Sequence, residues 1–449
     1  MEARFLGVLN IKPEEVKLAF SLWVLLAINT LVLELSDVVA TAGFISSLGV
    51  DKVPWLWIVT TLLTIFAAGG YLVIIDRYSR LQLVSWLMVG LAFFYLLLQV
   101  LFAFRAPDWF TYPILYLLAD QQLMLMPLAF WALASDVYAV TESKRVFPFI
   151  ASGAVIGGLA GNGIAAWVSV LAEKYAFGLS QVFIGVAIIL IMGAIFLRVM
   201  FLKTVLRTRQ SREEDASLKD TIKIGMDYFL NVPILKAVGI LMLLTGIVLT
   251  LIEFNFLSII NTSVTSDLEF QRFLGYYKAV QTTGLLIFQW LITSRLLSKI
   301  HLKYAFSPLP IALSVAGALA IGVPSLFGAS AARFVARTVF AGWDDSARKS
   351  LQGLVPDEKR GRIAAFMDSY FITTATIFGC VILIVLLALS SAGILTAQWS
   401  TWIYLGVAAL SALASIGVSV YLHKSYDTSM LNYRLARSKR KSMLDGIEF

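Results

Sequence analysis

Several residue types that carry chemistry in enzymes are scarce in this 449-residue sequence. It contains one cysteine, Cys380, and two histidines, His301 and His423, so an internal disulfide and a thiolate metal site are excluded. The H-E-x-x-H, G-x-S-x-G and P-loop patterns of zinc proteases, serine hydrolases and nucleotide-hydrolysing proteins are also missing. We therefore expect no cofactor and no metal, and we predict that the protein is not an enzyme.

Charged residues are scarce as well, and long apolar runs take their place. Only 14% of the residues are charged and 59% are hydrophobic, with a mean hydropathy of +0.83, whereas soluble domains contain about 25% charged residues. A membrane-spanning helix needs about 20 mostly apolar residues. The sequence therefore predicts an all-α membrane protein with about twelve spans, centred near residues 32, 64, 93, 123, 159, 192, 248, 285, 315, 338, 377 and 411.

The net charge of +8 is distributed unevenly among the loops. Basic segments follow the even-numbered spans, and they cover residues 76–80, 142–145, 203–223, 294–303 and 356–362, with a basic tail at 434–441. By the positive-inside rule we expect both termini to be cytoplasmic, in a cell (inner) membrane. We expect the tail to contact anionic lipid and no nucleic acid, and the first span to be retained, because 1–16 lacks a signal-peptide pattern.

A long polar segment in the middle of the sequence separates two similar halves. We predict a first six-helix half at 1–202, a linker at 203–224, a second half at 225–424 and a tail at 425–449. The first span contains "LVLELSD" and the seventh contains "VLTLIEFN". A tryptophan precedes "ESKR" in the first half and "DEKRGR" in the second.

This organisation resembles the major facilitator superfamily, which contains two parallel six-helix repeats. The loop "DRYSR" is similar to the cytoplasmic D-R-x-G-R signature of that superfamily, and it matches at Asp76, Arg77 and Arg80. The resemblance implies two pseudo-symmetric halves, with spans one, four, seven and ten around a central cavity.

Ionisable side chains within the spans are few, and lipid offers them no partners. Glu34 and Asp37 lie three residues apart in the first span, and therefore on one helix face. The other candidates are Asp120 in the fourth span, Glu253 in the seventh, Lys278 in the eighth, Arg333 and Arg337 in the tenth and Asp368 in the eleventh. We expect these groups to face the bundle interior or a hydrated cavity, as substrate-binding or coupling residues.

The same charges have a simpler interpretation as fixed interhelical ion pairs, for instance Glu34 with Arg333. The adjacent acids Glu34 and Asp37 repel each other, so we expect one of them to be protonated when no cation is bound. A second group of charges near the cytoplasmic ends is predicted either to latch helices together or to form gate contacts that break as the halves move. This group comprises Asp76, Arg77, Arg80, Lys144, Arg145, Asp344 and Arg348.

The fifth span contains the run "SGAVIGGLAGNG", with Gly153, Gly157 and Gly161 at four-residue spacing. Small residues at this spacing allow two helix backbones to approach closely. We therefore predict a tight helix contact within the bundle.

Three stretches resemble the non-mitochondrial ATP/ADP translocase family of plastids and intracellular bacteria. They are "FWALASDVYAVTESKRVFPFIASGAVIG" (130–157), "LIEFNFLSIINTSVTSDLEFQRFLGYYKAVQTTG" (251–284) and "ELSDVVATA" in the first span. The resemblance implies a nucleotide transporter in which Glu253 and Asp120 correspond to two acidic positions. The two basic positions of the family fall on Ser36 and Thr376.

We therefore predict a secondary active transporter that works by alternating access. The expected substrate is an organic anion or a nucleotide-like metabolite, moved by exchange or by ion coupling. Two alternatives stay open at this point: a lipid or lysolipid translocator on the same scaffold, and a non-transporting subunit of a larger complex. The expected partners are a small-molecule substrate and membrane lipid.

Overall fold

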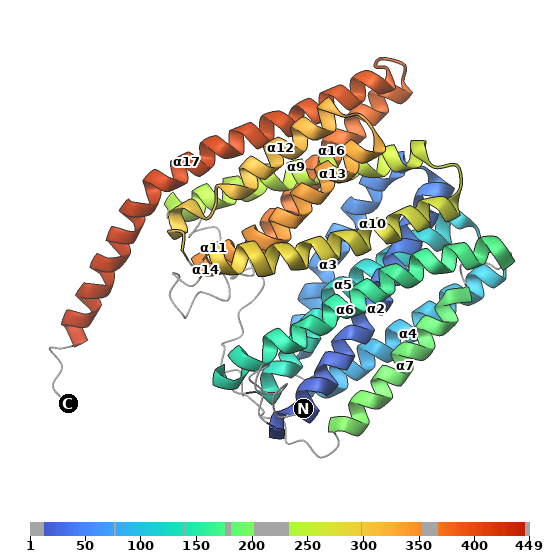
Figure 1. Ribbon diagram of the computed structural model, residues 1–449, viewed down its shortest axis with the longest axis horizontal. Helices are drawn as coiled ribbons and strands as arrows, with labels where there is room; N and C mark the ends of the chain where they lie inside the picture. Colours follow the sequence, from blue (N-terminus) through green and yellow to red (C-terminus); the bar gives the residue numbers. More distant parts are fainter. Residues whose placement is uncertain are drawn as a thin grey trace. The chain divides into compact units, whose positions relative to one another are not determined.

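The computed structural model describes residues 13–75, 78–138, 140–175, 181–201, 233–297, 299–352 and 367–444. These ranges contain helices and turns and no strand (Figure 1). Nine of the helices in the described ranges are long and apolar enough to cross a membrane. The predicted all-α membrane class is therefore confirmed.

The first six predicted spans correspond to six long helices. They are α2 (Pro13–Leu48), α3 (Val53–Ile75), α4 (Arg80–Ala103), α5 (Asp108–Val137), α6 (Val140–Tyr175) and α7 (Val182–Phe201). The short helix η1 (Val50–Lys52) joins α2 to α3, and Gly49 before it has a φ of 89°, which glycine adopts without strain. The side chain of Ser79 caps α4 by accepting a hydrogen bond from the Gln82 backbone N–H.

The last six spans also have their helices, but several are interrupted. They are α9 (Pro233–Ser263), α10 (Asp267–Phe288), α12 (Pro308–Gly322), α13 (Leu326–Val339), α16 (Ile372–Ser391) and α17 (Ala397–Leu444). Single π-helical turns adjoin three of them, at η3 (Gln289–Thr293), η5 (Phe340–Asp344) and η6 (Met367–Phe371). The short helices α11 (Ser294–Leu296) and α14 (Asp345–Gln352) follow η3 and η5. Such turns are frequently found at functional sites.

The chain groups into two compact units. The first contains Met1–Glu213 and Ile260–Thr283, and the second contains Glu214–Ile259 and Gly284–Phe449. The end of α9 and most of α10 therefore pack with the first unit. The predicted linker lies among residues 202–232, which are outside the described residues.

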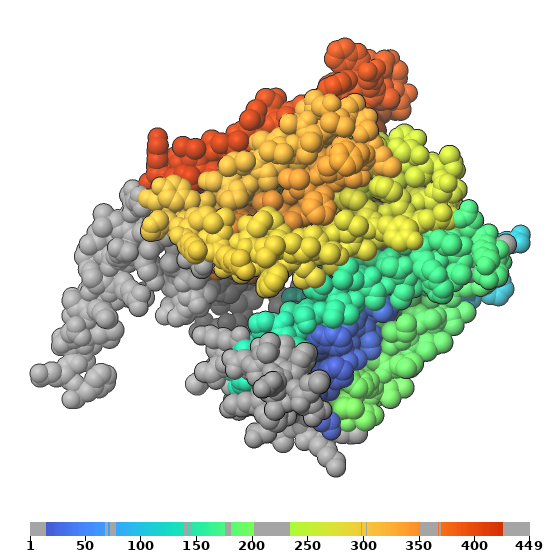
Figure 2. Space-filling model, in the orientation of Figure 1, coloured from blue at the N-terminus to red at the C-terminus, as the bar shows by residue number. Residues whose placement is uncertain are grey.

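Helix α2 is the central helix of the first unit, with contacts to α5, α6 and α7. The space-filling view shows part of α2 in blue between α6 and α7 (Figure 2). Large apolar side chains stay exposed on the outer helices, among them Phe66, Phe93, Trp167 and Met192. Exposed apolar surface of this extent is expected where helices face lipid tails.

Three glycines set the distance between α6 and α2. A Cβ atom built on any of these glycines would overlap a backbone carbonyl oxygen of α2. The glycines are Gly153, Gly157 and Gly161, and the carbonyl oxygens belong to Trp23, Ala27 and Leu31. The structure thus has the tight helix contact that the glycine spacing predicts.

We predict that Gly157→Ala destabilises the protein, because the added methyl group overlaps the Ala27 carbonyl oxygen. Overpacking of this kind costs about 1–3 kcal/mol. Gly163→Ala is the matched control on the same helix, since a Cβ there meets no atom within 4 Å. Thermal unfolding in detergent should show a lower Tm for Gly157→Ala alone. Equal Tm values for the two variants would contradict this account of the α2–α6 contact.

Candidate functional site

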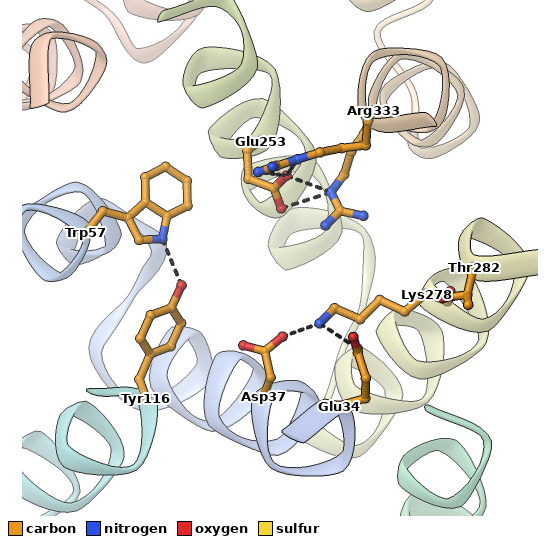
Figure 3. A network of polar contacts seen from close by, with 9 residues as sticks. Glu34, Asp37, Trp57, Tyr116, Glu253, Lys278, Thr282 and Arg333 are labelled. Atoms are coloured by element: carbon orange, nitrogen blue, oxygen red, sulfur yellow. Dashed lines mark hydrogen bonds and ion pairs between the residues drawn. The ribbon is translucent and has the colours of Figure 1, made fainter. Parts of the chain in front are cut away.

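The first charged cluster joins α10 to α2 within the first unit. The ammonium group of Lys278 lies between the carboxyl groups of Glu34 and Asp37 (Figure 3). Its Nζ is 3.4 Å from Glu34 Oε2 and also bonds to Asp37 Oδ2. The side chains of Lys278, Glu34 and Asp37 are 16%, 28% and 32% exposed, respectively. The two acids of the first span therefore share one cation in a partly accessible site.

Asp120 on α5 has a different environment. Its Oδ2 accepts hydrogen bonds from the Thr64 hydroxyl of α3 at 3.2 Å and from the Gln121 amide at 3.5 Å. Both donors are neutral. Within the described residues, Asp120 has no ion-pair partner.

Aromatic and amide side chains surround these acids on neighbouring helices of the same unit. The indole N–H of Trp57 donates to the Tyr116 hydroxyl at 2.9 Å (Figure 3). The buried Gln122 amide donates to the side chain and the backbone oxygen of Asn29 and accepts a hydrogen bond from Tyr95. The sequence analysis assigns no role to these hydrogen-bonding residues, because an uncharged polar residue in a span gives little indication of function by itself.

The second charged cluster joins α9 to α13 within the second unit. Arg333 Nε lies 2.9 Å from each carboxylate oxygen of Glu253, and Arg337 Nε lies 3.0 Å from Oε2 (Figure 3). The four-residue spacing on α13 brings both guanidinium groups to this one carboxylate. The Arg333 side chain is 9% exposed and its guanidinium also lies 4.6 Å from the centre of the Phe256 ring. Two cations and one anion leave the cluster with one net positive charge.

A cavity of about 70 Å³ borders this cluster inside the second unit. Arg337, Asp344 and Thr376 line it, together with Thr245 and Thr250. Each threonine hydroxyl donates to a backbone carbonyl four residues earlier on its own helix, so its lone pairs stay available as acceptors. The cavity thus offers one guanidinium, one carboxylate and three hydroxyl acceptors. The resemblance noted in the sequence analysis places one of the family's basic positions on Thr376.

Two of the π-helical turns are bonded to each other in the second unit. The Thr293 hydroxyl in η3 donates to the Gly342 carbonyl in η5 at 2.8 Å. A π-turn breaks the regular i→i−4 pattern and frees such a carbonyl oxygen. The next residue, Trp343, is buried and donates its indole N–H to the Ala305 carbonyl at 2.7 Å. Polar contacts therefore fix the chain between the cavity residues Arg337 and Asp344.

The predicted gate residues that the structure describes form ion pairs within their own units. Arg80 Nε lies 3.4 Å from Asp136 Oδ2, and Arg145 Nη2 lies 2.7 Å from Glu15 Oε1. In the second unit, Arg348 bonds to Asp344 at 2.8 Å and to Asp345 at 3.4 Å. Asp76 and Arg77 lie outside the described residues, and so do the side chains of Lys144 and Asp368.

The ion pairs that the described span residues form thus each join groups of one unit. Glu34 and Asp37 bond to Lys278, and Glu253 bonds to both arginines of the tenth span. The sequence analysis gives Glu34 with Arg333 as an example of an interhelical pair. In the structure, Glu34 bonds to Lys278, and Arg333 bonds to Glu253.

A comparison with protein families matches residues 44–341, about two thirds of the chain, to the TLC ATP/ADP transporter. The chain belongs to this family. The resemblance seen in the sequence is therefore confirmed, and the protein is a membrane transporter for nucleotide-like or organic substrates. The family favours transport of such a solute over lipid translocation or a non-transporting role. No curated protein matches the sequence.

Solved transporter structures share the fold. A mutant of the nucleoside transporter NupG is 17% identical, with a TM-score of 0.63, and the match covers 89% of this chain and 99% of NupG. A bacterial homologue of the iron transporter ferroportin, in an inward-facing state, is 14% identical, with a TM-score of 0.59 and coverage of 92% and 99%. At these identities the likeness concerns the fold alone, and it confirms the predicted major-facilitator architecture.

The neighbours Asp344 and Asp345 allow a matched test of the buried charges, because both bond to Arg348. The side chains of Asp344 and Arg348 are 6% and 4% exposed, whereas that of Asp345 is 38% exposed. We predict that Asp344→Asn lowers the free energy of unfolding by about 3 kcal/mol, because it leaves a buried cation poorly compensated.

Asp345→Asn should cost less than about 1 kcal/mol, as is usual for an exposed pair. Thermal or denaturant unfolding of the purified variants in detergent measures both effects. If the two substitutions destabilise the protein equally, burial does not distinguish the two carboxylates.

Proposed function

We propose that the protein moves an anionic, nucleotide-like metabolite by alternating access, and that the Arg337 side of the Glu253 cluster binds the anionic group. The observation that carries this proposal is the excess of positive charge in the second unit beside a cavity. Two arginines share one carboxylate there, and the cavity is lined by one of them. An anion restores neutrality at a place where charge imbalance is costly.

The two arginines differ in a way that assigns them separate tasks. Both carboxylate oxygens of Glu253 bond to Arg333, whose side chain is 9% exposed. Arg337 shares only Oε2, and its side chain is 38% exposed. A guanidinium has five N–H donors and recognises phosphate or carboxylate groups with two parallel hydrogen bonds. Arg333 would therefore hold Glu253 in place, while Arg337 turns its remaining donors to the substrate.

The acids of the first unit would couple or orient the substrate. Glu34, Asp37 and Asp120 outnumber the single cation Lys278 among the groups assigned to that site. The Arg80–Asp136 and Arg145–Glu15 pairs would act as gate contacts that break and re-form during transport. Both gate arginines belong to basic segments of the sequence, at the first residue of α4 and near the start of α6, and by the positive-inside rule we infer that these segments are cytoplasmic, in an inner membrane.

Uptake by proteoliposomes tests the proposed substrate class. Vesicles containing the purified protein are preloaded with unlabelled ADP and incubated with radiolabelled ATP, ADP, a nucleoside monophosphate, a nucleoside and a non-nucleotide organic anion. We expect uptake of at least one phosphorylated compound above that of empty vesicles. Uptake of none of the anions, together with flipping of a fluorescent lipid, would contradict the proposal and favour the lipid translocator.

We predict that Arg337→Gln lowers kcat/KM for the transported anion by about tenfold to a hundredfold, the equivalent of one charge-assisted hydrogen bond. Lys349→Gln is the control, since Lys349 is a cation of the same unit whose side chain is 64% exposed and pairs with Asp345. It should leave uptake unchanged. Equal kinetics for Arg337→Gln and the unsubstituted protein would remove Arg337 from the binding site.

A further inference from the structure

We propose that Asp120 binds and releases a proton during the transport cycle, so that substrate movement is coupled to H⁺. The inference rests on the proposed function, since a coupling residue requires a transport cycle. The evidence for it is a difference between the partners of the four carboxyl groups that lie within spans one, four and seven. Three of these groups, on Glu34, Asp37 and Glu253, form ion pairs with lysine or arginine. Asp120 alone among them has neutral partners within the described residues.

The hydrogen bonds of Asp120 suit either protonation state. In the ionised state its Oδ2 accepts from the Thr64 hydroxyl and the Gln121 amide N–H. The other atom of that amide, Gln121 Oε1, is buried and has no hydrogen-bond partner. An amide group can turn over and exchange the positions of its oxygen and nitrogen with little change in shape. After this exchange, Gln121 offers an acceptor to the O–H group of protonated Asp120.

The groups around Asp120 favour binding of a proton by its carboxylate over pairing with a lysine or arginine side chain. Helices α2, α3 and α4 pack against α5. From α2, the Asp37 carboxylate repels a negative charge on Asp120. Helix α3 offers the Thr64 hydroxyl and has no charged residue in its sequence. On α4, the Tyr95 hydroxyl donates to Gln122, and Arg80 pairs with Asp136 at the far end of α5.

The ion pair of Lys278 links this proton to substrate movement. Glu34, Asp37 and Asp120 carry three negative charges when ionised, and Lys278 supplies one positive charge. An unneutralised charge within a bilayer is expensive. A proton on Asp120 removes one of these negative charges. When Lys278 leaves Asp37, the repulsion between the two aspartates rises, and Asp120 binds its proton more tightly. Protonation of Asp120 therefore favours separation of Lys278 from α2.

Asp120 is also accessible enough to exchange protons. Its side chain is partly exposed, as are those of Thr64 and Gln121. A carboxyl group sealed in a dry core would keep one protonation state throughout the cycle. A partly exposed carboxyl with an unsatisfied acceptor beside it can change state as water reaches it.

The transport experiment uses the full chain in proteoliposomes, with radiolabelled ATP as the probe. Two modes are compared: accumulation driven by an inward pH gradient, and exchange with internal ADP at equal pH. For one proton per substrate, a gradient of one pH unit supports about a tenfold accumulation. We expect Asp120→Asn to abolish this accumulation and to lower exchange by a much smaller factor, because exchange moves no net proton.

Asp108→Asn is the matched control, because Asp108 lies in the first turn of the same helix and is exposed. It should retain both modes. Accumulation that does not respond to the pH gradient in the unsubstituted protein, or that persists in Asp120→Asn, would overturn the inference.

A substrate-independent measurement separates failure of this inference from failure of the proposed function. Infrared difference spectra recorded across a pH titration report the C=O band of a protonated carboxyl group. We expect a titrating band that disappears in Asp120→Asn and persists in Asp108→Asn, even if ATP is not transported. An unchanged band in Asp120→Asn overturns the assignment. If Asp120→Asn does not fold, Gln121→Leu replaces it: loss of pH-driven accumulation with retained exchange supports the inference, and unchanged accumulation overturns it.

Discussion

The cost of an unpaired charge in lipid is the constraint on which the rest of the structure depends. A charged side chain at the bilayer centre costs about 2.5–3.5 kcal/mol even on the mildest scales. Each unit meets this constraint with its own ion pairs, Lys278 with two acids of α2 and Glu253 with two arginines of α13. Neither cluster is electrically neutral. The first has an excess of acid and the second an excess of base. These opposite excesses are the basis of our proposals that a proton binds in the first unit and an anion in the second.

The helices hold these charges through close packing and through local departures from regular geometry. Glycines of α6 bring it against the backbone of α2, the helix that carries Glu34 and Asp37. In the second unit, single π-turns lie between α10 and α11, between α13 and α14, and directly before α16. The freed Gly342 carbonyl bonds to Thr293, so the irregular turn is satisfied internally. Within the second unit, these contacts fix the chain of η5 between the cavity residues Arg337 and Asp344.

Long apolar runs and a shortage of charge were enough to predict the helices, because length and hydropathy decide whether a segment can span a bilayer. The close contact of Gly157 was equally predictable, since small residues at four-residue spacing act through backbone geometry alone. Which acid bonds to which base was not predictable, because Lys278 and Asp37 meet only through tertiary packing. The neutral partners of Asp120 were missed for the same reason, and π-turns such as that at Gly342 leave no composition signal.

A double-mutant cycle on Glu253 and Arg333 tests most directly whether compensation of buried charge governs the structure. The free energies of unfolding of Glu253→Gln, Arg333→Gln and the double variant are measured in detergent against the unsubstituted protein. The account predicts that the double variant loses less stability than the sum of the single variants, with an interaction energy of at least about 2 kcal/mol, because neither member of the Glu253–Arg333 pair is left charged without the other. Additive losses would contradict it and would leave the ion pairs without a structural role.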